Sequence, residues 1–146
     1  FELQGDPPPF LFEMMGAVQE GNFEYGSELQ IRIWVDGMFR EADQVDADVR
    51  QHAAEMNLIA VKNGTMMVDF QPLNPLDPPA VGRLRELNVP ALIIVGALDN
   101  PEILRAADVM AAEIKDAKKV ILEDAAHVPN MERGAAFNQV VLEFLG

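Results

Sequence analysis

Residues 89–99 read Val89-Pro90-Ala91-Leu92-Ile93-Ile94-Val95-Gly96-Ala97-Leu98-Asp99, and this stretch decides the fold. Its continuous apolar run is typical of a parallel strand that is buried on both faces of a sheet. Pro101 fits the first turn of a helix that we expect to run to about Asp116. Residues 119–122 predict a second short strand, and residues 133–145 predict a final helix. This alternation predicts an α/β fold with parallel strands and flanking helices.

In the first half of the chain, the apolar residues recur at the spacing of short helices instead. The expected helices cover residues 10–20, residues 24–35 and a stretch to about Ala60 that follows an N-cap at Asp46. The side chains expected on their inward faces are Phe10, Met14, Val18, Leu29, Ile33, Trp34, Val49, Ala53, Met56 and Ala60. Residues 63–71 hold a possible strand. The proline-rich stretch 72–79 separates a helical segment, residues 1–72, from an α/β segment, residues 73–146.

The expected sheet is too small to stand alone. Two parallel strands joined by one helix cannot bury both faces of a sheet or pair both of its outer edges. Because the helical first half offers no obvious further strands, we expect the chain to be incomplete as a folding unit. The alternative is a small α+β domain with a sheet of two or three strands.

Composition excludes several classes of partner. The chain carries 24 acidic and 11 basic residues, a formal net charge of −13, whereas nucleic acids and anionic membranes bind clustered Lys and Arg. It has no cysteine, which excludes disulfides and Cys-ligated metals. No apolar run approaches the ~18 residues of a membrane span. Residues 1–15 contain no signal-like region, so we expect a cytoplasmic protein.

Two residues that can carry chemistry follow the ends of the two expected strands. Asp99 comes directly after the first strand, and His127 comes shortly after the second. Because a right-handed crossover makes such strands parallel, both side chains are expected at the same edge of the sheet, where active sites of this class lie. A carboxylate beside an imidazole fixes its tautomer and stabilises the imidazolium. Spacing alone leaves two alternatives, in which Asp99 is a helix N-cap and His127 a turn histidine.

The motifs around this pair resemble the C-terminal part of the α/β-hydrolase superfamily. The pattern P-x-L-x-x-x-G-x-x-D ends at Asp99, and the pattern H-x-P-x-x-E begins at His127. The resemblance covers residues 80–145, and residues 10–72 look like the helical cap that such enzymes insert over the site. It implies a partial α/β-hydrolase fold in which Asp99 is the triad acid and His127 the triad histidine.

The chain also departs from this family. Many members have Glu where Ala97 stands and Pro where Gly134 stands. The nucleophile elbow G-x-S-x-G is absent, and Ser27, which is the only serine, lacks the elbow's glycine spacing and is interpreted as a helix-terminal or surface serine. Thr65 has no better claim to be the nucleophile. The resemblance therefore implies that a Ser or Asp nucleophile is supplied by a missing N-terminal half of the same fold.

The resemblance implies a hydrolase of a small, mostly apolar carboxylic ester or lactone that needs no cofactor, with the chain alone inactive. The alternatives are an Asp-nucleophile epoxide hydrolase or haloalkane dehalogenase, and a non-catalytic fragment that serves only in binding or assembly. Trp34 is a candidate for substrate contact, although apolar residues at helical spacing also form cores. Glu132 either holds a backbone group near His127 or favours a helix N-terminus. We expect no metal site, because the two histidines fall in different halves of the chain.

Overall fold

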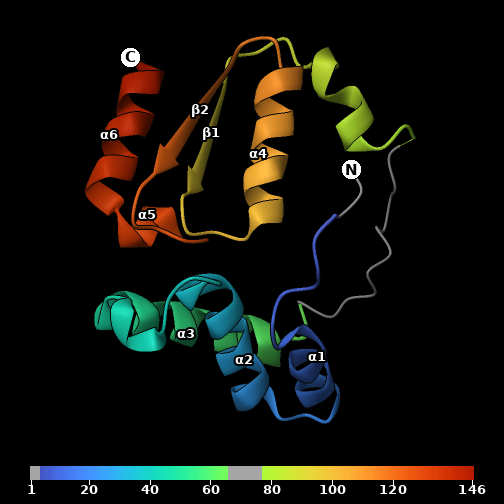
Figure 1. The fold of residues 1–146 in the computed structure, drawn as a ribbon, viewed down its shortest axis with the longest axis vertical. Coiled ribbons are helices and arrows are strands. Elements are labelled where there is room, and N and C mark those ends of the chain that lie inside the picture. The colour runs from blue at the N-terminus through green and yellow to red at the C-terminus, as the bar shows by residue number, and fades with distance from the viewer. Residues whose placement is uncertain (1–3, 66–76) are drawn as a thin grey trace. The chain divides into compact units, whose positions relative to one another are not determined.

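The computed structural model describes residues 4–65 and 77–146. They divide into two units (Figure 1). The helical unit contains the described residues 6–65, and the α/β unit contains residues 77–146 together with residues 4 and 5. The expected boundary at residue 72 and most of the possible strand at 63–71 lie outside the described residues.

The helical unit contains the helices that the sequence pattern predicts. They are α1 (Leu11–Gln19), α2 (Phe23–Ile31), the π-helical turn η1 (Arg32–Asp36), the short 3₁₀ turn η2 (Ala42–Gln44) and α3 (Ala47–Lys62). The helix expected over residues 24–35 is α2 together with most of η1. The side chain of Asp46 accepts hydrogen bonds from the backbone N–H groups of Asp48 and Val49, which confirms it as the N-cap of α3.

The three long helices of this unit close a core of their own. Its buried side chains are Met14, Val18, Leu29, Ile33 and Val61, and Leu11, Met15, Phe23 and Trp34 pack against them. The predicted core positions of Phe10 and Met56 are wrong, because both side chains are exposed. Phe10 precedes α1 with a left-handed backbone (φ 64°), so its side chain leaves the helical stripe. Met56 lies off the line of buried side chains that α3 presents through Ala53 and Val61.

A partly buried ion-pair network joins the helices of this unit. The Arg50 guanidinium donates to both carboxylate oxygens of Asp36, at 2.8 and 3.0 Å, and to Glu28 Oε1 at 2.7 Å. The Asp36 side chain is buried and the Glu28 side chain is partly exposed. Hydrogen bonds to Asp36 and then Glu28 raise the pKa of Arg50, and the two-pronged contact fixes α3 to η1.

The α/β unit follows the predicted order of strands and helices. Its elements are η3 (Ala80–Glu86), β1 (Ala91–Gly96), α4 (Pro101–Glu113), β2 (Ala117–Leu122), α5 (Pro129–Glu132) and α6 (Gly134–Leu145). The two strands are parallel, with Ala91 opposite Ala117, and α4 and α6 flank them on opposite sides (Figure 1). Helix α4 ends earlier than expected, because Ile114 has an extended backbone and leads into β2.

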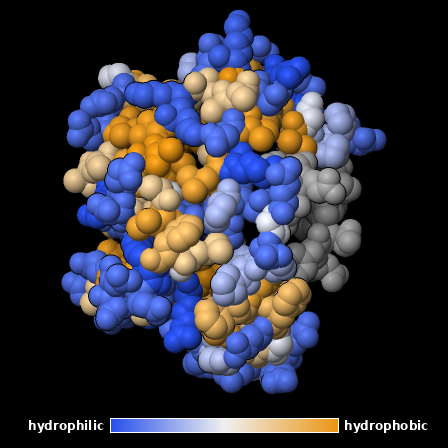
Figure 2. Space-filling model, viewed as in Figure 1, coloured by the Kyte–Doolittle hydropathy of each residue, from blue (hydrophilic) through white to orange (hydrophobic). Residues whose placement is uncertain are grey.

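The sheet of the α/β unit is less buried than its sequence predicts. Strand β1 was expected to be buried on both faces, but residues 91–94 are only half-buried. The inward face of α6, formed by Phe137, Val140, Val141 and Phe144, is half-buried too. In the part of the chain that the structure describes, the sheet has two strands, so β1 lacks the further neighbours that full burial requires. Apolar patches accordingly interrupt the polar surface in Figure 2.

Candidate active site

Asp99 and His127 meet at one edge of the two-stranded sheet. Both strands end toward the edge where α5 lies (Figure 1), and each residue sits in the loop that follows its strand. The distance between His127 Nδ1 and Asp99 Oδ2 is 2.9 Å, although 28 positions of sequence separate the two residues. The juxtaposition that their spacing predicts is therefore present.

The carboxylate of Asp99 is buried and aimed at the imidazole. Its Oδ1 accepts the backbone N–H of Asn100 at 2.7 Å, and its Oδ2 faces His127. The N-cap of α4 is Asn100, whose Oδ1 accepts the N–H of Glu102 at 2.8 Å. The alternative in which Asp99 caps this helix is therefore wrong. Asn followed by Pro101 at the first helical position was a sequence signal for the true cap.

The imidazole of His127 faces Asp99 through its Nδ1 atom. A neutral imidazole that donates its Nδ1–H to an ionised carboxylate carries its lone pair on Nε2. The hydrogen bond to Asp99 raises the pKa of His127 above its ordinary value of 6.5, against the opposing effect of burial. The side chain remains 42% exposed, so a reacting group can reach the ring. A carboxylate in this position stabilises the protonated form of the imidazole.

The loop that carries His127 lies tightly against the end of β1. The N–H of Leu98 donates to the carbonyl of Ala125 at 2.9 Å. A Cβ atom on Gly96 would lie 2.2 Å from the Ala126 carbonyl oxygen and 2.3 Å from that of Ala125, closer than such atoms approach. Glycine at position 96 therefore permits the approach that brings the two loops, and with them the two side chains, together.

A cavity of about 380 Å³ adjoins the pair within the α/β unit. Its lining combines Asp99 and His127 with mostly apolar side chains from β1 and α4, namely Ile93, Ile94, Val95, Ile103, Ala106, Ala107 and Met110. Such a lining offers an apolar surface next to the imidazole.

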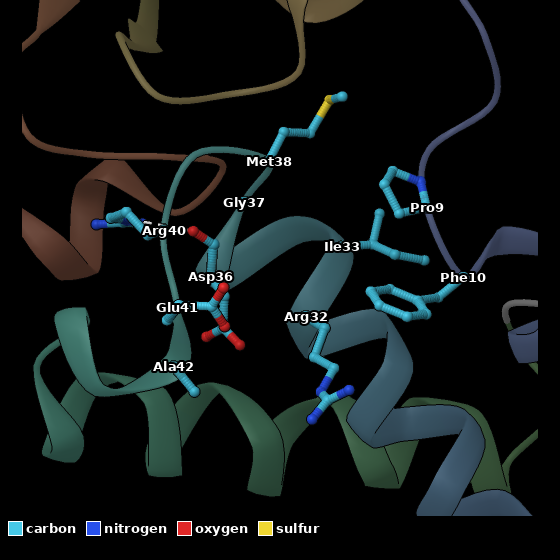
Figure 3. Close-up of a pocket in the computed structure, with 10 residues that line it drawn as sticks. All are labelled: Pro9, Phe10, Arg32, Ile33, Asp36, Gly37, Met38, Arg40, Glu41 and Ala42. Atoms are coloured by element: carbon cyan, nitrogen blue, oxygen red, sulfur yellow. Dashed lines mark hydrogen bonds between the residues drawn. The ribbon is translucent and has the colours of Figure 1, made fainter.

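Trp34 and Ser27 both lie in the helical unit. Trp34 is half-buried and packs against the core of this unit. Ser27 is buried in the middle of α2, so its interpretation as a helix-terminal or surface serine is wrong. Its Oγ accepts from Asn57 Nδ2 at 2.9 Å and joins α2 to α3. A second cavity, of about 320 Å³, lies within this unit, and Met38 is one of its lining residues. Figure 3 shows Phe10, Ile33 and Arg32 around it, with the carboxylates of Asp36 and Glu41.

Over residues 4–65 and 77–146, no three or more His, Asp or Glu side chains gather as a metal ion would require. Within the same ranges, no helix combines the length and the apolar character needed to cross a bilayer.

Comparison with known proteins identifies the fold. No protein-family model and no curated protein matches the chain. MenH from S. aureus matches over 91% of the chain, with a TM-score of 0.66 at 18% identity. A bromoperoxidase from Bacillus anthracis matches over 92%, with a TM-score of 0.65 at 17% identity. Est816, an N-acyl homoserine lactone degrading enzyme, matches over 94%, with a TM-score of 0.56 at 17% identity.

These structures define the class to which the fold belongs. They are α/β-hydrolase structures, and the matched region makes up 48% of MenH, 47% of the bromoperoxidase and 52% of Est816. The chain therefore has part of the α/β-hydrolase fold, as the sequence motifs implied. It spans about half the length of the proteins that it resembles.

Proposed function

We propose that the protein hydrolyses a small, mostly apolar carboxylic ester or lactone with His127 as general base and Asp99 as its orienting acid. The observation that carries the proposal is the 2.9 Å contact between His127 Nδ1 and Asp99 Oδ2 at the ends of neighbouring parallel strands. Structural neighbours that include a thermophilic esterase, a carboxylesterase and a lactone-degrading enzyme support the substrate class.

The proposed reaction proceeds in two steps. His127 Nε2 takes the proton of the nucleophile as it attacks the substrate carbonyl, and Asp99 stabilises the imidazolium that forms. The imidazolium then gives this proton to the departing alkoxide, which leaves as an alcohol. In the second step His127 takes a proton from water, which attacks the acyl-enzyme and releases the carboxylic acid together with the free nucleophile. Backbone N–H groups stabilise the oxyanion in both steps.

The nucleophile is proposed to come from the half of the fold that this chain does not match. Ser27 is buried between α2 and α3 and hydrogen-bonded to Asn57, which supports a structural role for it. The half-buried apolar residues 91–94 of β1 support the other half as partner, because a further strand alongside β1 would cover them. Substrate contact by Trp34 remains part of the proposal.

Hydrolysis of p-nitrophenyl esters by this chain together with the proposed other half of the fold tests this function. We expect Asp99→Asn and His127→Ala each to lower kcat/KM by about 10⁴-fold, as loss of a triad member does elsewhere. The control is Glu143→Ala, which removes an exposed carboxylate that accepts from Gln139 on α6. Wild-type turnover in His127→Ala would contradict the role of His127. Ester hydrolysis by the pure 16.1 kDa chain would contradict the external nucleophile.

A further inference from the structure

Glu132 reaches back from the end of α5 to the loop that carries His127. Its Oε1 accepts the backbone N–H of Ala126, six residues earlier, at 2.7 Å. Ala126 directly precedes His127 and is fully buried. Of the two sequence-based alternatives for Glu132, the structure therefore selects the one in which it holds a backbone group.

Other contacts also fix the loop. The Leu98 N–H donates to the Ala125 carbonyl at 2.9 Å, and His127 itself contacts Asp99. A buried N–H needs a hydrogen-bond partner, and the Glu132 side chain is long enough to supply one to Ala126. Because Ala126 and His127 are adjacent along the backbone, the position of the Ala126 amide limits where the imidazole can lie.

We propose that Glu132 is a positioning residue, which fixes the Ala126 amide so that His127 Nδ1 stays within hydrogen-bond distance of Asp99 Oδ2. The role that the imidazole then plays in catalysis rests on the proposed function. The positioning itself is a property of this chain and needs no substrate. The other charged groups nearby, Asp124 and Arg133, pair with each other at 3.3 Å.

Two substitutions separate the reach of the Glu132 side chain from its charge. Glu132→Gln keeps the length and an acceptor oxygen but removes the charge. Glu132→Asp keeps the charge but is one methylene shorter, so it cannot make the same contact with Ala126. If Glu132 acts by positioning, the Asp variant disturbs His127 and the Gln variant does not.

The experiment is an NMR titration of the histidine ring protons in the 146-residue chain. His52, which is exposed on α3, gives the second histidine signal and serves as internal reference. We expect the His127 titration to move to lower pH in Glu132→Asp, because its contact with Asp99 loosens, and to stay at the parent position in Glu132→Gln. Hydrogen exchange of the Ala126 amide is expected to be faster only in the Asp variant.

Three results would overturn the proposal. A shift in the Gln variant alone would mean that the charge of Glu132 acts on the imidazole directly. Equal shifts in both variants would mean a general disturbance of the loop. No shift in either, with only a loss of stability, would mean a purely structural role. Glu143→Ala, which removes a carboxylate from α6, is the matched control and leaves His127 unchanged. Since no substrate is involved, these outcomes are independent of the ester hydrolysis test.

Discussion

The helical unit and the α/β unit differ in how completely they bury their apolar residues. The helical unit surrounds Leu29 and Val61 almost fully and ties its helices with the Arg50 network. In the α/β unit, β1 and the apolar face of α6 remain half-buried. The candidate catalytic pair thus lies on the less complete of the two units.

This difference has a physical cause. A helix satisfies its backbone hydrogen bonds internally, so a few helices can close a core with side chains alone. A strand depends on neighbouring strands for its hydrogen bonds and on layers of helices for burial. Half of an α/β-hydrolase fold can therefore contain both a helical unit with a closed core and a sheet whose strands are only half-buried.

Leu→Ala substitutions, one in each unit, should give the largest difference in the free energy of unfolding. Leu29→Ala removes a side chain that is 1% exposed and should cost about 3 kcal/mol, whereas Leu142→Ala, at 68% exposed, should cost less than about 0.5 kcal/mol. Urea unfolding followed by circular dichroism measures both losses. Fluorescence of Trp34, the only tryptophan, reports the helical unit separately. Equal losses would show that the outer face of α6 is covered in solution.

Substitution of Arg50 should cause the next largest loss of stability. Arg50→Met leaves the buried Asp36 carboxylate without its cation and should cost about 3 kcal/mol. Arg32→Met is the control, since its guanidinium lies 3.5 Å from Glu28 at the surface and its loss should cost less than about 1 kcal/mol. The shift of the Trp34 fluorescence transition in urea measures both. If the two variants lost equal stability, the buried pair would not be what fixes α3.

A pair of glycine substitutions tests the close approach of loops in the α/β unit. Gly96→Ala places a Cβ 2.2 Å from the Ala126 carbonyl oxygen and should cost about 2 kcal/mol. Gly134→Ala, at the start of α6, meets nothing within 4 Å and should be neutral or slightly stabilising. Unfolding followed by circular dichroism, with hydrogen exchange of the β1 amides, gives the comparison. A neutral Gly96→Ala would contradict the tight contact between the loops.

The Asp99–His127 pair should make the smallest contribution to the free energy of unfolding, and this contribution should depend on pH. Because the folded-state pKa of His127 lies above 6.5, the pair stabilises the fold fully below that pH and loses its contribution as pH rises through the folded value. The contribution should be at most about 1 kcal/mol, because His127 is 42% exposed. Asp99→Asn should flatten the stability profile above pH 6.5. An unchanged profile would exclude the ion pair as its source.

Local patterns were enough to predict the helices and strands. Asp46 as a cap, the apolar run of β1 and Pro101 at the start of α4 depend on a few neighbouring residues. The prediction that Phe10 and Met56 are buried was wrong. The direction of a side chain depends on backbone angles and on its packing partner, and periodicity does not contain this information. The prediction that β1 is buried on both faces was also wrong. The burial of a strand depends on neighbouring strands and covering helices, which the residues of the strand itself do not specify.

The sequence by itself determined the order of elements, the parallel direction of the strands and the identity of Asp99 and His127 as the candidate pair. These follow from periodicity, from chain handedness and from two short motifs. Only the tertiary structure decided that Asn100 is the helix cap, that Gly96 admits the His127 loop and that Glu132 holds the Ala126 amide. The reason is that each of these depends on atoms brought together through space, across loops whose path no local pattern specifies.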